Sequence, residues 1–310
     1  MKIGIIGRSE LTYEAMLLAI RNGYEIAFIV TAKEAPEYKY TSKDFEKFAH
    51  ERNILFIHDP KINAEKLINI VASTSPDICI SVNYSGIIST DVIKLFPFGV
   101  LNAHGGDLPR YRGNACQAWA IINGENKMGL CIHKMIGGEL DSGDIISRSY
   151  KSIDINTRIG ELYKWMEKQI PHLLIEAIEE ISKNPNFILE SQSNDPNNAL
   201  RCYPRLPEDG KIDWNNSSIN IIRTINASSE PYSGAFCEYK NSKFIIWRAE
   251  LYNDNEVYCG IPGQVAHVDK IEKFIIIITG NGKIKINEVE FQGNRTNPTN
   301  IINSIRKRLK

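Results

Sequence analysis

The strongest constraint on the fold is a regular alternation of short apolar runs and longer amphipathic segments over the first hundred residues. The runs are rich in isoleucine and valine, which is typical of strands buried on both faces. The segments between them carry apolar residues at helical spacing. This alternation predicts an α/β fold, in which helices cover both faces of a mostly parallel sheet. We expect strands at 2–6, 26–30, 55–57, 78–82, 99–101 and 145–150, and helices at 11–21, 41–51, 64–72 and 159–181, where Pro171 predicts a kink or a break.

The second half of the chain has a different pattern. A segment at 184–198 is rich in Asn, Pro and Ser and poor in apolar residues, which is typical of a linker. With 310 residues the chain can form two domains, and we expect a boundary near Leu200, with domains at 1–199 and 200–310. Short β-rich runs between Gly, Asn and Asp turns predict that the second domain is a small β domain of barrel type. These runs lie at 236–239, 244–247, 264–268, 274–279 and 284–291.

Composition excludes several classes of protein. The chain has 37 basic and 37 acidic residues and a pI near 7.0, so it offers no electrostatic footprint for nucleic acid. Its six cysteines are scattered, and neither they nor the histidines have the spacing of a metal site, which favours reduced thiols and a cytoplasmic location. The same spacing leads us to expect no metal. We also expect no membrane partner, because no apolar run is long enough to span a bilayer and the first residues lack a signal-peptide core.

The candidate site lies in the stretch from Asn102 to Asp144. Asn102 and His104 follow a buried strand, where alternate residues share a face, and they lead into a glycine-rich loop. A second glycine-rich loop carries Asp141 and could bring it to His104. In a parallel sheet, ligands bind at the carboxyl ends of the strands, which is also where Gly7 and residues 84–88 fall.

These three side chains suit acyl or formyl transfer to an amine. The Asn102 amide can stabilise a developing oxyanion, which is worth roughly 3 kcal/mol for one well-placed donor. His104 can exchange protons near neutral pH or stabilise charge at the reacting centre. Asp141 can orient His104 and favour its charged form, or accept the amine proton through water. The alternative is that Asn102 and His104 cap a turn while Asp141 caps a loop.

Two further clusters could bind an anionic substrate. Gly7, Arg8 and Ser9 follow the first strand and could present N–H groups to a phosphate, or form a plain tight turn; the third glycine of a dinucleotide fingerprint is absent. Arg110, Tyr111 and Arg112 could bind a pyrophosphate and a base, or form a solvated loop. His133 lies in an apolar run, and we expect it to be a packed core histidine.

The central stretch resembles the folate-dependent formyltransferase family. The family motif is Asn-x-His-x-Ser-Leu-Leu-Pro, followed by Arg-Gly, a Trp-containing helix and Leu-Asp-x-Gly. This chain has Asn102-Ala-His104, Leu108-Pro109, Arg112-Gly113, Trp119 and Leu140-Asp141-Ser-Gly143. The segments Arg205 to Trp214 and Glu230 to Phe236 look like those shared by methionyl-tRNA formyltransferases and nucleotide-sugar formyltransferases.

The resemblance implies a Rossmann-like catalytic domain followed by an OB-like β barrel, and it suggests a homodimer. It implies that Asn102, His104 and Asp141 are catalytic and that 10-formyltetrahydrofolate is the formyl donor. The implied donor-binding residues are Gly86, Ile87, Ile88, Ile136, Gly137, Gly138, Glu139 and Leu140. The chain departs from the motif at Gly106 and Asp107, where Ser and Leu are usual. Our hypothesis is that Asp107 helps to hold the ammonium or hydroxyl groups of an amino sugar.

The acceptor is less well fixed than the chemistry. A methionyl-tRNA enzyme should carry a basic loop for RNA phosphates, whereas residues 32–53 mix acids and bases. We therefore expect a nucleotide-linked amino-deoxy sugar, of the dTDP- or UDP-4-amino-4,6-dideoxyhexose type, used for O-antigen or lipopolysaccharide. The alternatives are a methionyl-tRNA formyltransferase, a hydrolase that releases formate, and a non-catalytic module that binds folate or a nucleotide sugar.

Overall fold

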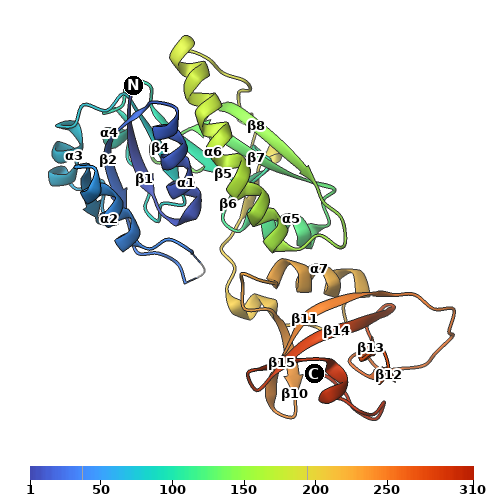
Figure 1. Ribbon diagram of the computed structural model, residues 1–310. Coiled ribbons are helices and arrows are strands. Elements are labelled where there is room, and N and C mark those ends of the chain that lie inside the picture. The colour runs from blue at the N-terminus through green and yellow to red at the C-terminus, as the bar shows by residue number, and fades with distance from the viewer. Residues whose placement is uncertain (37, 194) are drawn as a thin grey trace. The chain divides into compact units, whose positions relative to one another are not determined.

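The computed structural model describes residues 1–36, 38–193 and 195–310 (Figure 1). The chain forms two compact units. The N-terminal unit comprises Met1–Cys116, Met128–Lys151 and Tyr163–Tyr203, and the C-terminal unit comprises Gln117–Lys127, Ser152–Leu162 and Pro204–Lys310. Residues 37 and 194, which fall in the predicted mixed-charge region and linker, lie outside the described residues. The domain boundary near Leu200 stays a prediction.

The N-terminal unit is built on a seven-stranded sheet with the order β3-β2-β1-β4-β5-β7-β8. Its strands are β1 (Lys2–Gly7), β2 (Glu25–Thr31), β3 (Leu55–His58), β4 (Ile78–Val82), β5 (Val100–His104), β7 (Lys127–Lys134) and β8 (Ile145–Ser152). The strands from β3 to β5 pair in parallel, and β7 runs antiparallel to β5. The predicted α/β fold with a mostly parallel sheet is therefore confirmed.

Helices and two short strands complete this part of the chain. The helices are α1 (Ser9–Arg21), α2 (Ser42–Glu51), α3 (Glu65–Ala72), α4 (Thr90–Ile93), α5 (Cys116–Asn123), α6 (Ile159–Lys183) and the 3-10 helix η1 (Pro196–Asn198). Thr41 caps α2, because its N–H and hydroxyl donate to the Asp44 carboxylate, both at 2.7 Å. The short strands β6 (Tyr111–Gly113) and β9 (Leu200–Cys202) pair in parallel and are not expected from the sequence.

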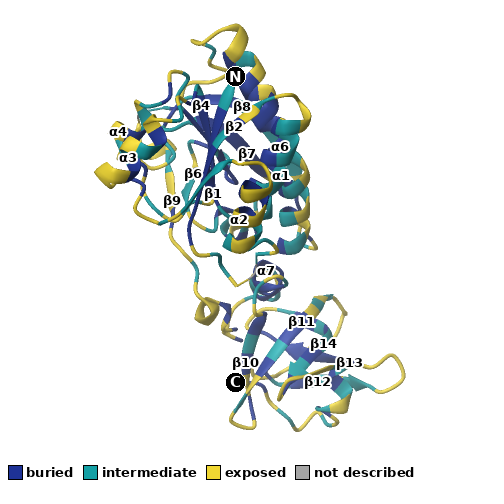
Figure 2. Cartoon of the chain, turned by 60° about the vertical axis from the view of Figure 1, so that its left-hand side comes forward, coloured by how far each residue is buried: buried dark blue, intermediate teal, exposed yellow. Residues whose placement is uncertain are grey.

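The core explains these elements. Strands β1 and β4 are buried along almost their whole length, as continuous apolar runs require, and Figure 2 shows them in the colour of buried residues. Helix α6 continues through Pro171, so the prediction of a break there is wrong. Ile170, Leu174 and Ile178 on this helix are fully buried, and their burial offsets the hydrogen bond that the proline cannot donate.

The C-terminal unit contains an antiparallel sheet with the order β10-β11-β14-β13-β12, to which β15 adds by pairing with β14. The β-rich architecture predicted for this region is confirmed. Its elements are η2 (Pro207–Gly210), α7 (Ser218–Ser228), β10 (Ala235–Tyr239), β11 (Ser242–Tyr252), β12 (Val265–Asp269), β13 (Phe274–Ile278), β14 (Lys283–Phe291), β15 (Asn294–Thr296) and η3 (Pro298–Asn300). Helix α7 packs on β11, and a single apolar core lies between the helix and the sheet.

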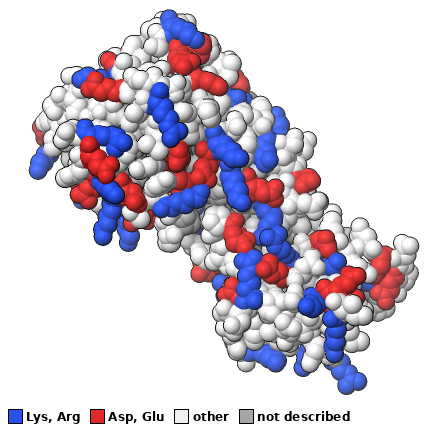
Figure 3. Space-filling view, in the orientation of Figure 1, with Lys and Arg blue, Asp and Glu red and all other residues white. Residues whose placement is uncertain are grey.

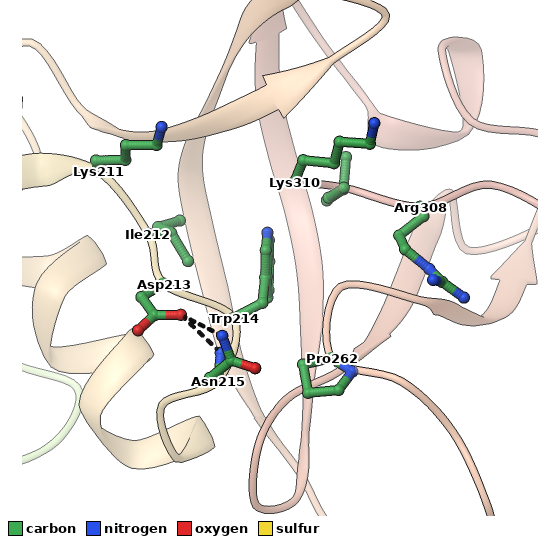
Figure 4. Close-up of a pocket in the computed structure, with 9 residues that line it drawn as sticks. Lys211, Ile212, Asp213, Trp214, Asn215, Pro262, Arg308 and Lys310 are labelled. Atoms are coloured by element: carbon green, nitrogen blue, oxygen red, sulfur yellow. Dashed lines mark hydrogen bonds between the residues drawn. The ribbon is translucent and has the colours of Figure 1, made fainter.

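A pocket of about 520 Å³ opens in the C-terminal unit (Figure 4). Ile212, Trp214 and Leu309 are among its lining residues and give it apolar walls, while Lys211 and Lys310 carry amino groups at its edge. The side chain of Asp213, also in the lining, accepts hydrogen bonds from Asn215 in its own turn. Among the described residues, no helix is both long and apolar enough to cross a membrane.

Candidate active site

Strand β5 carries Asn102 and His104 at the carboxyl edge of the parallel part of the sheet. Asn102 lies in register with Ser81 of β4 on one side and with His133 of β7 on the other. Because side chains alternate along a strand, Asn102 and His104 project from the same face, as the sequence predicts. His104 is 7% exposed, so its imidazole is almost completely removed from water.

The loop after β7 brings Asp141 to this face. Asp141 adopts a left-handed backbone conformation, with φ of 49°. Gly143 is required in the same loop, because a Cβ there would overlap the carbonyl oxygen of Lys134. The Lys134 amide donates to the Asp144 carbonyl at 2.9 Å, and the Gly113 amide donates to Asp141 Oδ2 at 2.9 Å. The Asp141 loop is therefore fixed to β7, and the carboxylate itself is held by the Gly113 amide.

The three predicted side chains converge. His104 Nδ1 lies 3.4 Å from Asp141 Oδ2. Asn102 Nδ2 lies 3.0 Å from His133 Nε2, which is itself 3.5 Å from Asp141 Oδ1. The proximity of Asp141 to His104, on which the sequence interpretation depends, is thus present, and the cluster contains a second histidine.

The hydrogen bonds of His104 assign its tautomer. Its Nε2 lies 2.6 Å from the carbonyl oxygen of Tyr111, and a carbonyl can only accept, so Nε2 carries a proton. In the neutral ring Nδ1 is then the unprotonated nitrogen, and it faces Asp141 across a longer contact. Burial lowers the pKa of His104 below its usual value and outweighs the opposing effects of Asp141 and the Tyr111 carbonyl. The neutral ring is therefore favoured, with a proton-accepting nitrogen beside a carboxylate.

Asp141 stays ionised in this environment. Burial alone would raise the pKa of its carboxyl group. The imidazoles of His104 and His133 and the Gly113 amide lower this pKa, and together they outweigh burial. The net pKa lies well below the usual range. An ionised carboxylate beside Nδ1 stabilises the imidazolium that forms when His104 takes up a proton.

His133 is a site residue that the sequence interpretation misses. It is buried, as a core histidine would be, but both of its ring nitrogens have polar partners. Its Nδ1 lies 3.0 Å from the Lys134 carbonyl oxygen, which assigns the proton to Nδ1 and leaves Nε2 to accept a hydrogen bond from Asn102. His133 therefore orients the Asn102 amide. The signal that reveals it is its register with Asn102 across two strands, which requires knowledge of the pairing.

Gln192 is a second residue that the sequence does not reveal, because it lies in the predicted linker. Its side-chain amide donates to the carbonyl oxygens of Asp141, at 2.8 Å, and Gly143, at 2.7 Å. Its Oε1 accepts from the Arg112 guanidinium at 2.8 Å. Gln192 thus connects the loop that carries Asp141 to strand β6, and Arg112 is engaged within the protein.

The predicted donor-binding residues lie on two loops that touch. A Cβ on Gly137 would overlap Thr90 at the start of α4, which directly follows the loop of Gly86, Ile87 and Ile88. Ile87 is 72% exposed, and Ile136 and Leu140 are also exposed, so these glycine-containing loops present apolar side chains to solvent. That combination suits a flat, partly apolar ring with hydrogen-bonding edges. The donor-binding role of these residues, including Gly138 and Glu139, stays a prediction.

The predicted substrate residues are in different environments. Arg8 donates to the carbonyl oxygens of Asn83, at 2.7 Å, and Lys33, at 2.8 Å, and so ties together the loops that follow β4 and β2. Ser9 is buried, and Gly7 allows close contact with Val82. Tyr111 is buried and contributes its carbonyl group to His104. The binding roles of these residues, and of the exposed Arg110, stay predictions.

Asp107 forms an ion pair with Arg148, in which Nη1 lies 2.6 Å from Oδ1. The guanidinium neutralises the carboxylate, which makes it a poor partner for the ammonium group of a substrate. The ion pair gives Asp107 a structural contact, and its role in holding an amino sugar stays a prediction.

Cys116 lies close to the site, with Sγ 3.7 Å from His104 Nε2, but its chemistry does not fit a nucleophile. A hydrogen bond to the Cys202 thiol and burial both raise the pKa of Cys116 well above its usual value. Within the described part of the chain, no cluster of His, Cys, Asp and Glu could hold a metal ion. The arrangement suits direct acyl transfer, with an amide for the oxyanion and an imidazole–carboxylate pair for the proton.

Comparison with known proteins agrees with this chemistry. Residues 2–178 match the family described as formyl transferase, and residues 206–306 match the formyl transferase C-terminal domain. A methionyl-tRNA formyltransferase from Ruminiclostridium cellulolyticum is 28% identical over 302 residues, which cover 95% of this chain and 93% of the relative.

Two solved structures share the fold. One is WlaRD, a sugar 3N-formyl transferase determined in the presence of dTDP and 5-N-formyl-THF, with a TM-score of 0.68 and 23% identity over 95% of this chain and 98% of that one. The other is an N-formyltransferase from Helicobacter canadensis in complex with folinic acid and dTDP-3-aminofucose. It gives a TM-score of 0.67 and 20% identity, covering 92% of this chain and 98% of that one.

Proposed function

The chain belongs to the formyl transferase family, whose members are folate-dependent enzymes, and on that premise we propose that it formylates a nucleotide-linked amino-deoxy sugar. The proposed formyl donor is 10-formyltetrahydrofolate, which supplies an activated one-carbon group. The observation that carries the proposal is the convergence of Asn102, His104 and Asp141 at the end of β5. The product would be a building block of O-antigen or lipopolysaccharide.

In the proposed reaction the sugar amine attacks the formyl carbon, a new C–N bond forms and the bond to the donor nitrogen breaks. The Asn102 amide has one hydrogen directed to His133, and its second hydrogen stabilises the negative charge that develops on the formyl oxygen. His104 Nδ1 takes the proton that the amine loses, and Asp141 stabilises the resulting imidazolium. His104 then returns this proton to the leaving nitrogen, so no net proton is gained or lost.

Charge supports a sugar rather than an RNA acceptor. Basic and acidic side chains are interspersed on the face shown in Figure 3, and the chain has no net charge. Lys39, in the region where a tRNA-binding loop would have to be basic, is paired with Glu167 at 2.6 Å. RNA affinity depends on neutralising phosphates, which paired lysines do poorly. The dTDP ligands named for the two structural relatives also support a nucleotide sugar.

A methionyl-tRNA formyltransferase is the second candidate, favoured by the sequence relative from Ruminiclostridium cellulolyticum. One assay distinguishes the two functions. The purified full chain is incubated with 10-formyltetrahydrofolate and each of a panel of acceptors. The panel contains dTDP- and UDP-linked sugars with the amine at position 3 or 4, and methionyl-tRNA. We expect formylation of a nucleotide sugar, measured by mass spectrometry. Formylation of methionyl-tRNA alone would overturn the proposal.

The substitution His104→Asn separates an enzyme from a binding module. We expect the formyl-transfer rate to fall by at least about 1,000-fold while the donor still binds, because the proton acceptor is lost and the donor loops are unchanged. Unchanged formyl transfer would contradict the assigned role. Release of formate without an acceptor, at the same rate as with one, would identify a hydrolase instead.

A further inference from the structure

The contact between the Tyr111 carbonyl and His104 depends on Gly106. A Cβ at position 106 would overlap the Tyr111 carbonyl oxygen and would lie 2.5 Å from His104 Nε2. Neither neighbour could stay where it is, because one is backbone and the other is the ring of a buried side chain. Gly106 therefore lets the loop that follows β5 fold back until its carbonyl group meets the imidazole.

The loop is held from its other side by Arg148 on β8. Arg148 Nη1 donates to Asp107 Oδ1 at 2.6 Å, and Nη2 donates to the Leu108 carbonyl at 2.8 Å. The guanidinium also contacts Glu190 at 3.0 Å and the Tyr150 hydroxyl at 2.9 Å. The Arg148 side chain is only 10% exposed, so its guanidinium group lies largely out of water within these contacts.

Asp107 passes this constraint on to Tyr111. Its carbonyl oxygen accepts hydrogen bonds from the amides of Arg110, at 2.9 Å, and Tyr111, at 3.3 Å, in a tight turn. The neighbouring Leu108 is buried in a small apolar cluster with Cys131 and Ile145. A continuous chain of contacts thus runs from the guanidinium through the turn to the carbonyl group that faces His104.

We propose that Arg148 is a positioning residue for formyl transfer, which acts through Asp107, Leu108 and the Tyr111 carbonyl to keep the proton of neutral His104 on Nε2. Nδ1 is thereby left as the nitrogen that accepts a proton. The inference rests on the proposed function only for its catalytic consequence. Arg148 touches neither His104 nor Asp141, and it is therefore not itself catalytic.

The test compares variants that differ in whether they loosen the loop. Arg148→Met alone would leave the half-buried Asp107 carboxylate without this partner, so Asp107→Asn/Arg148→Met is made beside it to remove both charges. Glu190→Gln is the matched control, because it removes a partner of Arg148 that lies outside the loop. All proteins are full-length and are checked for cooperative unfolding.

The first readout is the ring ¹⁵N spectrum of His104 in histidine-labelled protein, which reports the tautomer without any substrate. We expect the Nε2-protonated form in the parent and in Glu190→Gln, and a mixture of tautomers in both Arg148→Met proteins. The second readout is kinetic. We expect kcat to fall about 10- to 100-fold in these two proteins while KM for the formyl donor stays within about twofold.

A merely structural role would reduce stability and leave the tautomer of the folded protein unchanged. An unchanged His104 spectrum in folded Asp107→Asn/Arg148→Met therefore overturns the inference. Failure of the proposed function is distinguishable, because it appears as a parent protein that formylates none of the nucleotide sugars in the acceptor panel. The tautomer experiment needs no acceptor and gives its result in either case.

Discussion

Asp141 faces two imidazoles at once, which makes the site sensitive to loss of a single charge. We predict that Asp141→Asn, which keeps the size of the side chain, lowers kcat by at least about 100-fold, because the imidazolium of His104 loses its stabilising partner. The carboxylate raises the pKa of His104 in the parent, so its removal lowers that pKa further. The acidic limb of the pH profile of kcat/KM should therefore move to lower pH. An unmoved limb would mean that His104 is not the group that titrates.

In the proposed reaction the Asn102 amide can give the oxyanion only one of its hydrogens, because His133 accepts the other. We predict that His133→Leu lowers kcat about tenfold with little change in KM, since the amide is no longer oriented. The substitution also leaves the Lys134 carbonyl without its donor, at a cost of about 1–3 kcal/mol in the free energy of unfolding. His133→Gln is the control, because its amide can replace one of the two contacts and should retain more activity. Steady-state kinetics and urea unfolding measure both effects.

At the scale of elements, the loop between β7 and β8 is folded so tightly on β7 that glycine is required. We predict that Gly143→Ala displaces Asp141 and abolishes most formyl transfer, because the new Cβ would overlap the Lys134 carbonyl oxygen. Overpacking of this kind costs about 1–3 kcal/mol of stability. Ser142→Ala in the same loop is the control, since it removes only a hydrogen bond to Glu139. Equal activity of the two variants would contradict the interpretation of Gly143.

The elements also show how far the sequence could be interpreted. Apolar runs predict β1 to β4, because parallel strands buried on both faces leave a continuous local pattern. Asn102, His104 and Asp141 are predictable because a family motif and the chemistry of the residues agree. His133 and Gln192 are not predictable from the sequence. His133 lies in an apolar run, and its contact with Asn102 depends on the pairing of β5 with β7. Gln192 lies in a polar segment, and its contacts depend on how that segment folds onto the Asp141 loop. The prediction of a break at Pro171 is wrong because burial of the apolar face of α6 outweighs the loss of one backbone hydrogen bond at the proline.

For the whole molecule, the site makes stability depend on pH. His104 has a lowered pKa in the folded state, so below its unfolded value of about 6.5 the unfolded chain binds more protons and stability falls. Asp141 also has a lowered pKa, so its contribution is lost at still lower pH, below about 3.9. We predict that the free energy of unfolding decreases from pH 7 to pH 5, by up to about 1.4 kcal/mol per pH unit for one proton.

The variant His104→Asn checks this dependence, because asparagine does not titrate. Its free energy of unfolding, measured by urea denaturation at each pH, should vary less between pH 7 and pH 5 than that of the parent. Parallel curves for the two proteins would exclude His104 as the source of the slope.

The six cysteines all lie in the described part of the chain, and Cys259 is the one among them that is exposed. A maleimide dye should therefore attach to a single position on each chain, in the unit that does not carry His104, and leave the buried thiols untouched. If two chains associate, mixing chains that bear donor and acceptor dyes would produce energy transfer between the dyes. Self-association can therefore be measured on the native sequence, without an added cysteine.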